Sequence, residues 1–103
     1  MFGNMFGDME TKQEEIKKHL ATVIVEADAG DGAVKVSANA NRVLQNIAID
    51  RSKLEWDDTE QVEDLILVAV NNALELAAAK EAEETQKLLK ELLPPGFGNL
   101  FGG

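Results

Sequence analysis

The sequence contains no cysteine and a single histidine, His19, among its 103 residues. Without thiols the chain can form neither a disulfide nor a thiolate metal site, and such a composition fits the reducing cytoplasm. A metal centre needs several ligands, so one histidine predicts none. We therefore expect a cytoplasmic protein that carries no metal and no other cofactor.

Long apolar runs are also missing. No stretch reaches the ~20 apolar residues of a membrane span, and the N-terminus lacks the basic region and apolar core of a signal peptide. Aromatic residues make up only 5% of the chain, and they are not interleaved with basic residues as in single-strand nucleic-acid binders. The sequence therefore predicts a soluble chain without a membrane segment.

No catalytic constellation is evident either. Nucleophilic catalysis needs a hydroxyl or thiol beside a base, and His19 has no evident partner in the sequence around it. The turn Gly30-Asp31-Gly32 is not followed by the lysine and helix of a P-loop, so it predicts a hairpin. Asp57-Asp58 is explained more simply as a helix cap than as a cation site. The sequence predicts a protein that is not an enzyme.

What the chain has in excess is acid, with a net charge of −9. The excess is uneven: residues 51–103 hold eleven acids against five bases, whereas residues 1–21 hold four acids against three lysines. Because neutralisation of phosphate by Lys and Arg supplies most non-specific DNA affinity, any DNA-facing surface is expected to draw on the first helix.

The strand signal lies in residues 22–50. Apolar residues alternate with polar ones there, the pattern of strands with one buried face, at positions Val23, Val25 and Ala27 and again at Val34, Val36 and Ala38. A third run covers residues 43–49, and its phase requires a bulge near Gln45-Asn46. These runs predict a three-stranded antiparallel meander.

Two tight turns join the predicted strands. Residues 29–32 contain two glycines and an aspartate, which tolerate the positive φ of a tight reversal. In residues 39–42, asparagine is expected to supply the left-handed conformation.

Amphipathic helices flank the sheet. The first is predicted from an Asp8 cap to Ala21, with Met9, Ile16 and Leu20 on one side. The second is predicted from a cap at Asp57 or Asp58 to residue 92 or 93. Its sheet-facing stripe comprises Val62, Ile66, Ala69, Ala73, Leu76 and Ala77, widened by Leu65, Val68 and Val70.

That stripe is broader than one sheet face needs, which indicates a second buried surface against the first helix or a partner subunit. From Lys80 onward the helix is expected to project beyond the compact body. Between the third strand and this helix, Leu54 and Trp56 are expected to pack back over the sheet or over the start of the helix.

The two ends of the chain repeat a motif, FGNMFG at 2–7 and FGNLFG at 97–102. Glycine at this density disfavours helix and strand, so segments 1–7 and 94–103 are predicted to be flexible tails. The alternative is that their phenylalanines dock on a partner or on a neighbouring copy.

The fold class that follows is α+β: one domain over residues 1–103, with the order helix, three-stranded antiparallel meander, long helix. The sheet is apolar on one face, and a chain this small leaves part of that face uncovered. A second copy would complete the core, so a homodimer is expected.

The run AGDGAVKVSANAN, the closing IAID, the long second helix and the PPGF tail resemble the YbaB/EbfC family of bacterial nucleoid-associated proteins. The resemblance covers nearly the whole chain. It implies a homodimer that binds double-stranded DNA in the nucleoid, with affinity that is weak and salt-sensitive. The phosphate contacts it implies would come from lysines of the two helices, namely Lys12, Lys17, Lys18, Lys80, Lys87 and Lys90.

The composition alone leaves two other functions open. One is a protein-interaction adaptor, using the acidic surface, the leucine-edged end of the second helix and the tails. The other is a module whose function is assembly itself. Lys12, Lys17 and Lys18 would then belong to a solvated, salt-bridged face, with Lys17 and Lys18 at favourable spacings from Glu14 and Glu15. A duplex that shows no mobility shift even at low salt would favour the adaptor.

Overall fold

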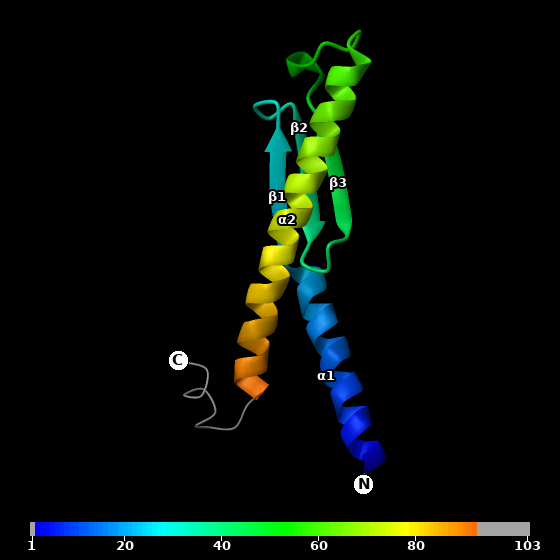
Figure 1. The fold of residues 1–103 in the computed structure, drawn as a ribbon, viewed down its shortest axis with the longest axis vertical. Coiled ribbons are helices and arrows are strands. Elements are labelled where there is room, and N and C mark those ends of the chain that lie inside the picture. Colours follow the sequence, from blue (N-terminus) through cyan, green and yellow to red (C-terminus); the bar gives the residue numbers. More distant parts are fainter. Residues whose placement is uncertain (1, 93–103) are drawn as a thin grey trace.

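The computed structural model describes residues 2–92. Two helices flank a three-stranded sheet (Figure 1), which confirms the predicted α+β order. The elements are α1 (Phe2–Thr22), β1 (Ile24–Ala29), β2 (Val34–Asn39), β3 (Leu44–Ile49), the 3-10 turn η1 (Arg51–Lys53) and α2 (Thr59–Leu92).

The sheet has the order β1-β2-β3 with both pairs antiparallel, as predicted. Ser37 pairs with Asn46, but the next residue, Ala38, pairs with Leu44. Gln45 is therefore the extra residue of a β-bulge. The bulge brings the apolar residues of β3 onto one face, which confirms the reason for predicting it.

The first turn adopts the backbone that its sequence predicts. Gly30, Asp31 and Gly32 all have positive φ, at 66°, 57° and 86°. A Cβ at position 30 would lie 2.9 Å from a methyl carbon of Leu65. Glycine there serves both the left-handed backbone and the close approach of α2.

The second turn differs from the prediction in one residue. Arg42, not an asparagine, takes the left-handed conformation, with φ of 64°. Asn39 acts through its side chain instead: its Oδ1 accepts hydrogen bonds from the backbone N–H groups of Asn41, at 2.9 Å, and Val43, at 3.2 Å. Asparagine therefore shapes this turn by hydrogen bonding rather than by its own φ.

Helix α1 begins at Phe2, six residues before the predicted Asp8 cap. The prediction that residues 1–7 lack helical structure is thus wrong from residue 2 onward. Each glycine costs a helix only about 1 kcal/mol, and the segment contains no proline to interrupt the ladder of hydrogen bonds. The other predicted tail, residues 94–103, lies outside the described residues.

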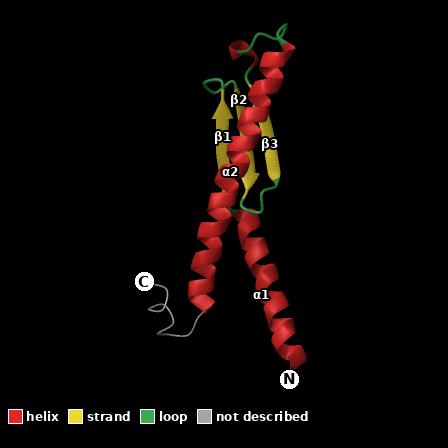
Figure 2. Ribbon diagram, in the orientation of Figure 1, coloured by secondary structure: helices red, strands yellow, loops and turns green. Residues whose placement is uncertain are grey.

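Helix α2 is capped as predicted, because Asp58 Oδ1 accepts a hydrogen bond of 3.1 Å from the N–H of Gln61. The helix lies across β1 and β2 (Figure 2). Alanines make the closest approach: Ala69, Ala73 and Ala77 are fully buried against the sheet.

Two predicted members of the buried stripe are exposed. Leu76 and Val68 are each 47% accessible. Ala77 continues the line of Ala69 and Ala73 at the i+4 spacing, so Leu76 falls on the flank of α2 that faces β1.

Trp56 is also placed differently from the prediction. Its side chain is 46% exposed, and the Arg51 guanidinium lies over its ring at 4.9 Å. Asp50 caps η1 by accepting hydrogen bonds from the N–H and hydroxyl of Ser52. This tight turn carries the chain away from the sheet before Trp56, so only Leu54 of the predicted pair is half-buried.

Strand β3 is left uncovered. Every residue of β3 is exposed, since α2 covers the other two strands. At the opposite end from η1, α1 and the second half of α2 both extend past the sheet and diverge as two arms (Figure 1). The projection of α2 from about Lys80 onward is as predicted.

Candidate nucleic-acid interface

The lysines of α1 are exposed and available. Among the described side chains, neither Lys17 nor Lys18 forms an ion pair, so the predicted pairs with Glu14 and Glu15 do not form. Exposed ion pairs of this kind contribute little free energy, because their formation restricts the conformations of two long side chains. Both ammonium groups can therefore meet a phosphate without first losing an acidic partner. Lys12 lies further along the same exposed arm.

The β2–β3 turn holds the base of this arm. The Nδ2 of Asn41 donates a 2.9 Å hydrogen bond to the carbonyl of Lys17. The N–H of Ala40 donates to the carbonyl of Leu20 at 3.1 Å, and Leu20 is only 5% exposed. A shallow hollow lies at this junction, lined by Glu14, Lys17, Lys18, Ala21 and Asn41.

The lysines of α2 are engaged by an acid. Glu83 lies 3.3 Å from the Nζ of Lys87 and 3.5 Å from the Nζ of Lys80. The hydrogen bond from Lys87 and the charge of Lys80 hold the pKa of Glu83 below its ordinary value. A phosphate at either lysine would have to displace this carboxylate. Lys90, the last of the six predicted residues, is exposed on the same arm.

Acids of α2 also lie close to the last turns of α1 and to the β2–β3 turn. His19 Nε2 lies 3.7 Å from Glu84, and Arg42 lies 3.6 Å from Glu81. The partners are separated by 39 residues or more in the sequence, and no local pattern indicates these pairs. Within residues 10–91 no group of three potential ligands could hold a metal ion.

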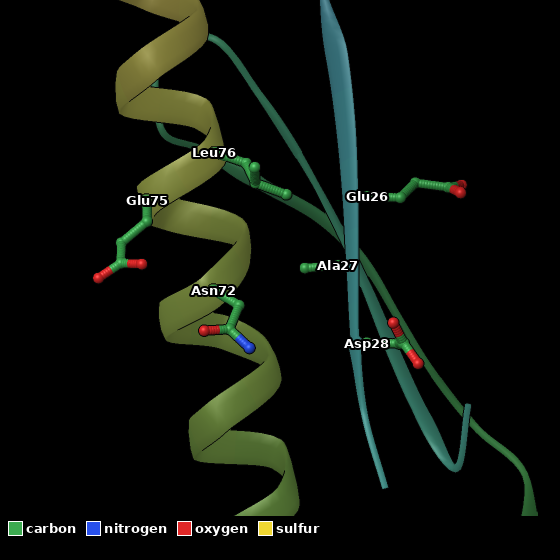
Figure 3. A pocket seen from close by; sticks show the side chains of 6 residues that line it. All are labelled: Glu26, Ala27, Asp28, Asn72, Glu75 and Leu76. Atoms are coloured by element: carbon green, nitrogen blue, oxygen red, sulfur yellow. The ribbon is translucent and has the colours of Figure 1, made fainter. Parts of the chain in front are cut away.

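A second hollow lies between β1 and α2 (Figure 3). Ala27 and Leu76 point toward each other across it, while Glu26 and Asp28 project from the opposite side of the strand. Asn72 and Glu75 complete the lining. Its lining is acidic, and Lys35, which pairs with Asp28 across the strands, is the base that stands beside it within the described residues.

The structure therefore divides the six predicted lysines into two sets. Within residues 10–91 those of α1 form no ion pair, although Glu14 lines the same hollow as Lys17 and Lys18, whereas Lys80 and Lys87 share one carboxylate. Residue spacing alone indicates this second pattern, since Glu83 stands at i+3 from Lys80 and i−4 from Lys87.

No helix in the described part of the chain is long and apolar enough to cross a membrane.

Known proteins resemble this chain over nearly its whole length. It is 37% identical over 105 residues to a nucleoid-associated protein of Flavobacterium johnsoniae, covering 98% of this chain and 97% of that protein. It is 43% identical over 97 residues to one of Thermoanaerobacter pseudethanolicus, covering 91% and 87%.

The fold is also found in a crystal structure of an uncharacterized protein from Helicobacter pylori. That structure matches with a TM-score of 0.71 at 20% identity, over 85% of this chain and 92% of that one. The model of the YbaB/EbfC DNA-binding family matches residues 1–92. The chain thus belongs to the YbaB/EbfC family, which consists of DNA-binding proteins and not of enzymes.

Proposed function

We propose that this protein binds double-stranded DNA in the nucleoid as a homodimer, and that the lysines of α1 make the principal phosphate contacts. The observation that carries the assignment is the contrast between the two arms. Lys17 and Lys18 have no acidic partner among the described side chains, whereas Lys80 and Lys87 share Glu83. The relatives named above are nucleoid-associated proteins, which supports the same cellular location for this chain.

The surface proposed for pairing is the uncovered side of β3. Leu44, Ile47 and Ile49 pair across the strands with the buried residues Ala38, Val36 and Val34, so they lie on the same face as the core. They are nevertheless 40%, 43% and 36% exposed.

The neighbouring flank of α2 extends this apolar surface. Val70 packs against the core and Leu67 is 60% exposed. Helical spacing places both on the side of α2 away from Leu65 and Leu76, which face β1 and its turn. A contiguous apolar face of this kind is typical of an interface, and a second copy can cover it isologously.

Formation of a dimer would also help this acidic chain to bind DNA. With a net charge of −9 per copy, one α1 arm has little to offset long-range repulsion from DNA. Two linked arms bind with an enhanced effective concentration. Even so, the affinity should be weak and should fall steeply with salt.

A charge-neutral double variant tests the assignment. If both copies contact phosphate, Lys17→Gln/Lys18→Gln removes up to four contacts and lowers the salt slope, d log K/d log[salt], by about 3–4. Lys80→Gln/Lys87→Gln is the matched control, with the same change in charge on the other arm. It should change the slope less, because Glu83 offsets one of the two positive charges there. An equal effect of the two double variants, or none from the first, would refute the role of α1.

A protein partner is the second candidate function. Leu89 is 50% exposed near the end of α2, and the hollow beside β1 presents Leu76 within an acidic rim. These features suit an adaptor that binds through the C-terminal helix. If the wild-type protein binds no duplex even at low salt, the adaptor function is favoured over DNA binding.

A further inference from the structure

We infer that Asn41 is a positioning residue for DNA binding, which fixes the α1 arm against the sheet and so orients Lys17 and Lys18. The inference rests on the proposed function. Asn41 stands in the β2–β3 turn, 24 residues from Lys17 in the sequence, and its side chain reaches the carbonyl of that residue at 2.9 Å. It also lines the hollow that contains both lysines.

The geometry of the turn explains why the side chain of Asn41 can hold α1 in place against the sheet. The N–H of Asn41 donates to Asn39 Oδ1, and Asn39 is itself 7% exposed between the strands. The next residue, Arg42, is held in a left-handed conformation and donates its N–H to the carbonyl of Asn39. The amide of Asn41 is therefore carried on a turn whose conformation is fixed from both sides.

The contact lies near the C-terminal end of α1, where this helix meets the rest of the protein. The hydrogen bonds at Lys17 and Leu20 join the final turns of α1 to the body of the protein. With a rise of 1.5 Å per residue, Lys12 lies about 7–8 Å along the helix from residue 17, so a rotation at this contact redirects the side chains of Lys17 and Lys18 and displaces Lys12. Two arms can contact one duplex together only if each is held at a defined angle. Loss of the Asn41 hydrogen bond should therefore weaken DNA binding although no charged residue is removed.

The chain offers a matched control in the same hairpin. The amide of Gln45 donates a 3.1 Å hydrogen bond to the carbonyl of Val43 and is also exposed. Asn41→Ala and Gln45→Ala each remove one bond from a side-chain amide to a carbonyl, but only the first loosens α1. Asn41→Asp and Gln45→Glu form a second pair, which keeps side-chain size, removes the donor and adds equal charge.

The test combines arm position with DNA affinity. Because the chain has no cysteine, spin labels on Gln13→Cys and Gln86→Cys report the separation of the arms, with unlabelled protein in excess to suppress contacts between copies. Asn41→Ala should broaden the distance distribution and weaken duplex binding roughly threefold to tenfold, the effect of about one net hydrogen bond. The salt slope should stay unchanged, since no phosphate contact is lost. Gln45→Ala should change none of these.

Each result is decisive. An unchanged distance distribution in Asn41→Ala and Asn41→Asp, or equal losses in the Gln45 variants, would overturn the inference. A reduced salt slope would show that Asn41 acts through charge or direct contact instead. Wild-type protein that binds no duplex would overturn the proposed function as well, whereas wild-type binding with undiminished Asn41 variants would overturn the inference alone.

Discussion

Ile47→Lys should separate the proposed dimer. Ile47 is 43% exposed in the single chain, and burying a whole isoleucine is worth about 1.5–3 kcal/mol. The area left to bury on pairing is then worth about 0.6–1.3 kcal/mol per copy, or about 1.3–2.6 kcal/mol for two copies in an isologous interface. Its loss weakens the dimer roughly tenfold to eightyfold, and an uncompensated ammonium in the interface adds to that.

The assay is sedimentation equilibrium combined with a duplex titration. Ile47→Lys makes the chain less acidic, so simple electrostatics would strengthen DNA binding, whereas loss of the second arm would weaken it. Ile24→Lys is the matched control: it makes the same change on the opposite face of the sheet, at a side chain 52% exposed. It should remain dimeric and, because it adds the same charge, bind duplex at least as tightly as wild type does. A dimeric Ile47→Lys variant with undiminished affinity would refute the proposed interface.

Three further outcomes follow from the described contacts. Glu83→Gln should strengthen duplex binding at low salt by releasing two lysines of α2, and unchanged titrations would contradict this. Gly30→Ala should lower the free energy of unfolding by about 1–2 kcal/mol or more, because of its positive φ and the approach to Leu65, and by more than alanine at the other glycine of that turn. Hydrogen bonds from the Ser52 hydroxyl and N–H hold the pKa of Asp50 below its ordinary value. The stability this carboxylate adds should therefore be present at neutral pH and lost as the pH falls through the lowered value, and an Asp50→Asn variant should not show that loss in acid denaturation.

Local patterns predicted much of the fold. Alternation in residues 22–50 identified the strands, the phase error at Leu44 located the bulge, and two adjacent aspartates located the cap of α2. These features are encoded by near neighbours in the sequence. Physical chemistry of short segments was therefore enough to place them.

What was missed depends on tertiary placement. The sequence does not reveal that α2 lies over β1 and β2 rather than centrally. The exposure of Leu76 was therefore not foreseen, nor was the identity of the strand that the helices leave uncovered. Trp56 was expected to pack over the sheet or the start of the second helix, but the capped η1 turn carries it outward. The joint between Asn41 and α1 links residues far apart in sequence, and no local periodicity could indicate it.

If this acidic chain holds DNA through a few lysines on paired arms, duplex binding by the wild-type protein must depend steeply on salt. With Lys12, Lys17 and Lys18 engaged in both copies, the slope of log K against log[salt] should approach about −5, a loss of roughly a thousandfold between 50 and 200 mM salt. Fluorescence anisotropy with a labelled duplex measures this slope. Binding that is absent at the lowest salt, or that does not change across the series, would contradict the proposed phosphate contacts of these lysines.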